Sequence, residues 1–176
     1  PIYFSDVVVR RDSPFYSFAQ LRGASWAFNE PNSHSGYNVA RARLAELGVR
    51  QGFFREAVES GAHSVSLEMI SDGRVDGAAI DSTVLEWLAI EQPELNARTR
   101  IVETIGPSPI PPWVISTKVA KRWRRKLRAA LLEMHRDRFG REVLACGRLR
   151  RFAAAQDADY DAIRAMARIA AEVSFA

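Results

Sequence analysis

The chain has 176 residues, of which 47% are hydrophobic and 26% are charged, a composition typical of a globular protein with one substantial core or two small lobes. Its one cysteine, Cys146, excludes an internal disulfide framework, and three scattered histidines argue against a structural metal site. No apolar stretch is long enough to cross a membrane as a helix, and we expect no cofactor.

The first segment, residues 2–9, alternates in polarity and is rich in β-branched residues, as strands are. The chain starts at Pro1, without a methionine and without a charged and then apolar signal segment. We therefore expect that the sequence begins within a longer protein, and that an export signal and a preceding lobe lie outside it.

Strands and helices alternate along residues 24–105. The expected strands cover 24–28, 53–59, 75–80 and 100–105. The expected helices begin near Ser35, His63 and Ser82. This alternation predicts an α/β lobe with a mainly parallel sheet flanked by helices. In such sheets ligands bind beyond the carboxyl ends of the strands, so the polar residues that follow the strands should share one crevice.

The first of these junctions reads Asn29-Glu30-Pro31-Asn32-Ser33-His34-Ser35-Gly36-Tyr37. Its hydroxyl residues, Ser33 and Ser35, fall in the first turn of the expected helix, where backbone N–H groups are free and the helix dipole is positive. Short donors around such a turn suit an oxyanion. The alternative is an ordinary helix cap, because serine and asparagine are common caps.

The next two junctions supply further polar residues. His63 follows Ser60-Gly61-Ala62 at the start of a helix, and Asp81 with Ser82 follows a short strand. Each is also typical of a cap or a surface position when considered separately. Together they would place anion donors close to a carboxylate.

Basic residues are concentrated in residues 118–176, and above all in 118–128, around an apolar stripe at helical spacing. Contact with nucleic acid or an acidic membrane is one interpretation. The solvated face of an amphipathic helix is the other, and we favour it because the basic residues surround the stripe without interleaved aromatics. We therefore expect no nucleic-acid partner.

Beyond residues 29–37, three further segments carry a resemblance to a known family: Ser60-Gly61-Ala62-His63, Gly73-Arg74-Val75-Asp76-Gly77-Ala78-Ala79-Ile80-Asp81-Ser82 and Gly106-Pro107-Ser108-Pro109-Ile110-Pro111-Pro112. They occur in the order found in the phosphate, phosphite and phosphonate solute-binding proteins of ABC transporters. The chain resembles this family over most of its length, and Asp157-Ala158-Asp159-Tyr160 with the following helix is similar to the family's closing segment.

The resemblance implies a type II periplasmic-binding fold, in which two α/β lobes joined by crossing strands clamp a ligand. Residues 1–11 would be a crossing strand, 12–105 the ligand-binding lobe, 106–117 a proline-rich return hinge and 118–176 helices that pack on the other lobe. The protein would be the receptor of an ABC importer, periplasmic or membrane-anchored outside the cytoplasm. It would capture a phosphonate-, phosphite- or phosphate-like anion without catalysis and deliver it to a membrane permease.

The resemblance also implies a set of ligand-binding residues. They are Asn29, Ser33, His34, Ser35, Gly36, Tyr37, His63, Asp81 and Ser82. The turn from Ser33 to Ser35 would hold the oxygens of the anion, His63 would add a contact, and Asp81 would face the other end of the ligand. His34 departs from the small hydroxyl residue usual in the family, so a carboxylate, a sulfonate or a larger phosphate ester remains an alternative ligand.

Two other functions use the same architecture. The ligand-sensing domain of a transcription regulator would need a DNA-binding segment before Pro1. A thiamine-pyrimidine-synthase-like enzyme would need a nucleophile, yet Cys146 lies far from the expected crevice and no other nucleophile has an obvious base. His34 or His63 could still act as a general base, and a turnover assay would decide.

Overall fold

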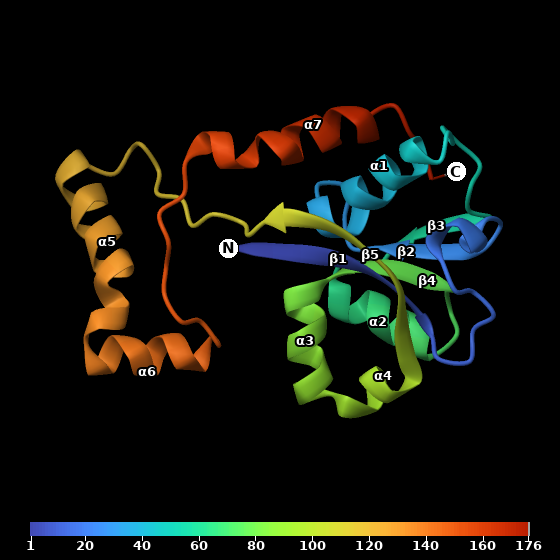
Figure 1. Ribbon diagram of the computed structural model, residues 1–176, viewed down its shortest axis with the longest axis horizontal. Coiled ribbons are helices and arrows are strands. Elements are labelled where there is room, and N and C mark those ends of the chain that lie inside the picture. Colours follow the sequence, from blue (N-terminus) through green and yellow to red (C-terminus); the bar gives the residue numbers. More distant parts are fainter. Residues whose placement is uncertain (176) are drawn as a thin grey trace. The chain divides into compact units, whose positions relative to one another are not determined.

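The computed structural model describes residues 1–175 and divides them into two compact units (Figure 1). The larger unit comprises residues 2–109 and the C-terminal segment from Tyr160 on, and the smaller comprises Pro1 and residues 110–159. The larger unit contains the strands β1 (Ile2–Arg10), β2 (Ser25–Phe28), β3 (Glu56–Glu59), β4 (Gly77–Asp81) and β5 (Thr99–Pro109). Its helices are α1 (Val39–Glu46), α2 (His63–Ser71), α3 (Ser82–Glu91), α4 (Pro93–Arg98) and α7 (Asp161–Ala170), and the smaller unit holds α5 (Lys121–Glu133) and α6 (Arg138–Cys146).

The five strands form one sheet in the order β3-β2-β4-β1-β5. Strand β2 pairs in parallel with β3 and β4, whereas β1 is antiparallel to both of its neighbours, β4 and β5. Strands β2 to β5 therefore run in one direction and β1 in the other. The expected α/β lobe with a mainly parallel sheet is confirmed.

The sheet separates two apolar cores, because alternate residues of a strand face opposite sides. On β1, Val7 and Val9 enter one core and Val8 enters the other. Helices α1 and α7 cover the first face, and α2, α3 and α4 cover the second (Figure 1). The first core is largely aromatic, with Trp26 and Phe54 stacked at a centroid distance of 4.7 Å.

The C-terminal segment completes the first core. Helix α7 packs on α1, and Val173 and Phe175 beyond it are buried. The Ser174 amide donates to the Arg50 carbonyl at 2.8 Å, which fixes this tail to the loop after α1. Residues 118–176 were expected to act as one set of helices. The structure instead places α7 with the sheet, because the apolar residues that follow it fill the aromatic core.

The two expected crossing segments both contribute to the sheet. Strand β1 covers most of residues 1–11 and is an inner strand, and residues 106–109 of the expected return hinge extend β5; the crossing between lobes stays a prediction. Helix α4 was not expected; it begins at Pro93, a residue well suited to a first helical turn.

The smaller unit carries the basic helix. Within the described chain, α5 has no buried side chain, and Trp123 and Leu127 of its apolar stripe are about half exposed. Arg122 and Lys126 lie over the Trp123 ring at 5.8 and 5.1 Å from its centroid. The packing of this stripe on another lobe stays a prediction. None of the helices in residues 1–175 combines the length and the hydropathy that a membrane crossing requires.

Candidate functional site

Polar side chains gather at the edge of the sheet where β2, β3, β4 and β5 end. The three predicted junctions meet here, because parallel strands present their carboxyl ends on one side. The antiparallel β1 begins at the same edge and adds Tyr3, and the end of β5 adds Ser108, which pairs with Tyr3 in the sheet register. The sequence predicted neither Tyr3 nor Ser108 as a site residue.

The turn after β2 differs from the predicted helix start. Residues His34–Asn38 form a π-helical turn, and α1 begins only at Val39. The Asn38 amide donates to the Ser33 carbonyl at 3.1 Å, five residues back, which makes a turn wider than that of an α-helix. Ser33 and Ser35 are 8% and 7% exposed. The Ser33 hydroxyl oxygen accepts from the Gly36 amide at 3.1 Å, so its own O–H stays available as a donor.

Two hydrogen bonds join this turn to distant parts of the chain. Ser35 Oγ lies 2.8 Å from Nε2 of His63 at the start of α2. His34 Nε2 lies 3.1 Å from Ser108 Oγ. The structure therefore brings together the residues of the first and second predicted junctions and ties them to β5.

Tyr3 is a buried donor in the middle of this cluster. Its side chain is 3% exposed and hydrogen-bonds with Ser108 and Ser35. Burial, and then the Asp81 carboxylate, raise the pKa of Tyr3 to about 12, against the opposing effect of those hydrogen bonds. The phenol is therefore neutral and able to donate at physiological pH. The sequence carried one signal for this position: Tyr3 and Ser5 are polar, whereas Val7 on the same face of β1 is apolar.

Both imidazoles of the site are neutral near pH 7. Burial lowers the pKa of His34, and burial likewise lowers the pKa of His63 against the opposing effects of the Asp81 carboxylate and the Ala79 backbone. A neutral imidazole offers one donor and one acceptor. The site thus consists of hydroxyls, neutral imidazoles and one carboxylate.

These imidazoles should make stability depend on pH. Because the pKa values of His34 and His63 are lowered on folding, the unfolded chain takes up protons first on acidification. Their contribution is complete above about pH 6.5 and is lost as the pH falls through their folded-state values. We expect the melting temperature to drop between about pH 7.5 and about pH 5.5, and a His34→Gln/His63→Gln variant to drop less.

Comparison of the wild type with the His34→Gln/His63→Gln variant isolates the contribution of the two imidazoles to the pH dependence of stability. The buried Asp6 carboxyl, whose pKa is raised mainly by burial, contributes with the opposite sign but is present in both. An equal change of melting temperature in the two proteins would contradict the prediction.

Gly36 has no room for a side chain, because Asn29 and His63 both lie close to it. A Cβ atom on Gly36 would collide with the side-chain oxygen of Asn29 and would lie 3.1 Å from Cε1 of His63. The same Asn29 oxygen is buried and has no hydrogen-bond partner in the described chain. These two predicted residues therefore determine how the π-helical turn packs.

The remaining predicted residues divide between the site and the core. Oδ1 of Asp81 accepts from the Thr83 amide at 2.8 Å, so Asp81 caps α3 as the cap interpretation expected. The Ser82 hydroxyl accepts from the Phe4 amide at 3.0 Å. The Tyr37 ring, in contrast, packs on Phe28 and Phe175 with centroid distances of 4.8 and 5.0 Å, so it belongs to the aromatic core.

Comparison with known proteins identifies the family of this chain. A family model described as the periplasmic substrate-binding protein of phosphonate ABC transporters matches residues 1–160. The chain belongs to this family. The resemblance inferred from the sequence is confirmed, and so is the type II periplasmic-binding fold. The phosphonate-binding family consists of transport receptors rather than enzymes.

Solved structures show how far the fold likeness extends. A binding-protein component of an ABC phosphonate transporter from Pseudomonas aeruginosa is 23% identical, with a TM-score of 0.84 over 97% of this chain and 58% of its own. PhnD1 from Prochlorococcus marinus, solved with methylphosphonate, is 18% identical, with a TM-score of 0.83 over 98% of this chain and 68% of its own. A Xanthomonas citri protein bound to chloride ion is 20% identical, with a TM-score of 0.78, and the chain spans 66% of its length.

Proposed function

We propose that this chain is the solute-binding part of an ABC importer outside the cytoplasm, and that it captures a small oxyanion of the phosphonate, phosphite or phosphate type. One observation carries this proposal: the hydroxyls of Tyr3, Ser35 and Ser108 form one hydrogen-bonded cluster with two imidazoles at the edge of the sheet where the parallel strands end, and Ser33 caps the turn that carries Ser35. Family membership supports the transport role and a permease partner.

Neutral donors suit reversible capture. An anion held by hydroxyls, imidazoles and a helix start gains several charge-assisted hydrogen bonds. It needs no buried cation, whose desolvation would cost several kcal/mol. Release to a permease then requires only that these hydrogen bonds be exchanged for water.

Closure of a second lobe would complete the capture. Strands β1 and β5 pair up to Ile2 and Pro109, and the Ile110 amide donates to the Pro1 carbonyl at 3.2 Å. The chain thus leaves the sheet by two adjacent extended segments. We propose that the ends of these two strands, within residues 1–11 and 106–117, act as the hinge about which the two lobes of the receptor close on the anion.

The site residues can be tested by truncating hydroxyls. We expect Ser35→Ala to weaken binding of methylphosphonate about 10- to 100-fold, because a hydrogen bond to a charged group contributes about 1.5–3 kcal/mol. Ser33→Ala should also cost about 1 kcal/mol of stability through loss of its cap. Calorimetric titration measures both affinities, and exposed Ser174→Ala is the control. Wild-type affinity in a folded Ser33→Ala/Ser35→Ala variant would show that both serines act only as helix caps and do not bind the anion.

The ligand class can be screened by thermal unfolding. Methylphosphonate, phosphite, phosphate, methanesulfonate and acetate form the panel, since His34 leaves sulfonates and carboxylates as alternatives. A ligand at 100 times its dissociation constant adds about 2.7 kcal/mol of stability. Stabilisation by a phosphorus anion is the expected result, and the absence of any shift across the panel would refute the proposed function.

One observation favours an enzyme as the second candidate. The sequence offered no nucleophile with a base, yet Ser35 Oγ and His63 Nε2 form the 2.8 Å contact that such a pair requires. We propose that the pair binds without turnover, in keeping with the family. Incubation with a phenyl ester of methylphosphonate should release no phenol beyond the uncatalysed rate.

A further inference from the structure

We propose that capture of the anion moves the ring proton of His63 from Nδ1 to Nε2, while His34 keeps its own proton on Nε2 throughout. This inference rests on the proposed function, because it describes how the same site gives a proton to the bound anion. His63 would thus be a positioning residue, which acts on the anion through the Ser35 hydroxyl.

Five side chains of the site form one chain of hydrogen bonds. Their order along it is His34, Ser108, Tyr3, Ser35 and His63. The two outer bonds join Nε2 of an imidazole to a serine oxygen, at 3.1 Å for His34 with Ser108 and at 2.8 Å for His63 with Ser35. The two inner bonds join the Tyr3 hydroxyl to Ser108 and to Ser35. The chain of bonds therefore crosses the site from one imidazole to the other.

The number of protons in this chain of bonds is fixed when both imidazoles are neutral. Burial lowers the pKa of His34 and of His63, so the neutral form of each is present at about pH 7.5. Each of the three hydroxyls and each of the two neutral imidazoles then carries one proton that it can donate. The two outer and two inner bonds use one proton each. One proton is therefore left over.

The surplus proton has a place on His63 but not on His34. Nδ1 of His34 is buried and has no hydrogen-bond partner in the described chain, so a proton there would be an unpaired buried donor. His34 therefore keeps its proton on Nε2 and donates it to Ser108. Nδ1 of His63 also makes no close hydrogen bond, but the Ala79 backbone lies near enough to favour a ring proton. Without an anion, the surplus proton is therefore on Nδ1 of His63, and Ser35 donates to Nε2.

A bound anion competes with His63 for the Ser35 proton. Once Ser35 donates to the anion, its oxygen and a bare Nε2 would be two acceptors 2.8 Å apart. A proton on Nε2 removes this conflict, because the imidazole then donates to the Ser35 oxygen. Nδ1 gives its proton to water and Nε2 takes one from water, so the net number of protons is unchanged. All the bonds are then kept, and Ser35 accepts from His63 and Tyr3 while it donates to the anion.

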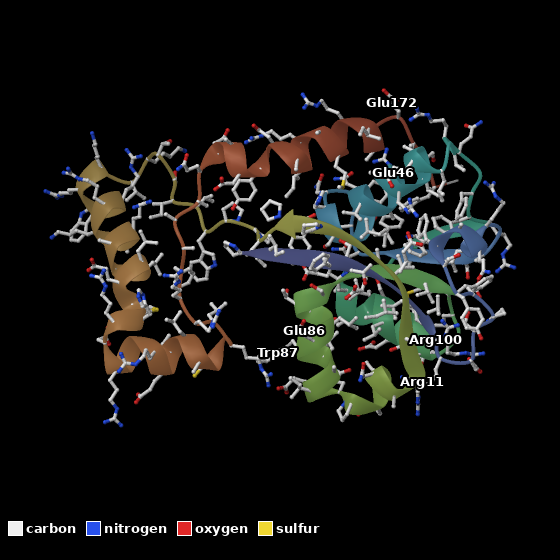
Figure 2. The ribbon with its side chains drawn as sticks, in the orientation of Figure 1. Arg11, Glu46, Glu86, Trp87, Arg100 and Glu172 are labelled. Atoms are coloured by element: carbon white, nitrogen blue, oxygen red, sulfur yellow. The ribbon has the colours of Figure 1, made fainter. Side chains whose placement is uncertain are left out.

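The charges around His63 leave the ring neutral. Burial has the largest effect on the pKa of His63 and outweighs the Asp81 carboxylate, which favours a second ring proton. Among the described residues, Asp81 is the carboxylate that acts on His63, whereas Glu86, labelled on α3 in Figure 2, acts on Asp6. The ring therefore exchanges one proton position for the other and does not become a cation.

The test is the nitrogen NMR spectrum of the imidazole rings in the whole chain, at about pH 7.5, with and without saturating methylphosphonate. The chain has three histidines, so His34→Gln and His63→Gln variants suffice to assign the rings. We expect Nδ1 of His63 to move from the chemical shift of a protonated nitrogen to that of a bare one, and Nε2 to move the opposite way. The rings of His34 and His135 should keep their tautomers and serve as internal controls.

Ser35→Ala and Ser33→Ala form a matched pair of variants. Both remove a hydroxyl from the same turn, but Ser35 contacts His63, whereas Ser33 accepts from the Gly36 amide. At methylphosphonate concentrations that saturate each variant, Ser33→Ala should show the full change of tautomer at His63. Ser35→Ala should show none, because the oxygen that joins the ring to the anion is gone.

Three results would overturn the proposal. An unchanged His63 tautomer at saturation would overturn it and leave the receptor function intact. A doubly protonated His63 ring in the bound state would also do so, and a binding enthalpy that varies with the ionisation enthalpy of the buffer would reveal that uptake of a proton. Failure of every anion of the panel to bind would overturn both the inference and the proposed function.

Discussion

Replacing Gly36 with alanine should weaken oxyanion binding by at least about 100-fold and destabilise the chain by about 1–3 kcal/mol. The added methyl group would collide with the Asn29 side-chain oxygen and come within 3.1 Å of His63 Cε1. Both neighbours resist displacement, because the Asn29 oxygen is buried and His63 is hydrogen-bonded to Ser35. We therefore expect the π-turn and the Ser35–His63 contact to separate.

Calorimetric titration with methylphosphonate and chemical denaturation measure the two effects. Gly147→Ala is the control, because a Cβ there would meet its nearest neighbour at 3.7 Å, an ordinary contact. Wild-type affinity in the Gly36→Ala variant would show that the geometry of this turn does not set binding.

Replacing Phe175 with alanine should cost about 3–5 kcal/mol, the usual range for a buried aromatic residue. Its ring is 4% exposed and contacts Trp26, Phe28, Tyr37 and Phe54, with centroid distances from 5.0 to 6.4 Å. Since Tyr37 belongs to the π-helical turn that we propose binds the anion, methylphosphonate affinity should fall as well.

Thermal and urea unfolding give the stability change. Phe139, which is 75% exposed on α6, supplies the control, and its replacement by alanine should change stability by no more than about 0.5 kcal/mol. Equal effects of the two substitutions would contradict the placement of the C-terminal tail in the aromatic core.

Much of the fold followed from local patterns. The alternation of strands and helices, and the rule that ligands lie beyond the carboxyl ends of parallel strands, sufficed to group residues 33–35 with His63 and Asp81. The family motifs cover the same junctions. These features are local in the chain, so a single sequence displays them.

Features that depend on the pairing of strands distant in the chain could not be predicted from the sequence. Tyr3 reaches the site because β1 runs antiparallel between β4 and β5, and Ser108 because β5 pairs with it up to Pro109. No local spacing encodes that register. The resemblance that named Tyr37 as a ligand-binding residue did not indicate that its ring packs in the aromatic core.

The place of β1 in the sheet also governs when this lobe can fold. Strand β1 pairs with strands that lie about 75 and 100 residues further along the chain, since Ser5 pairs with Asp81 and Ile105. Contacts of such long sequence separation slow folding, because the chain between them must be ordered first. The sheet therefore cannot be completed while residues 82–109 are still being synthesised. The aromatic core cannot be completed until Phe175 has been added. Until then the valines of β1 are exposed, and this nascent segment is the part of the lobe that a chaperone would need to protect.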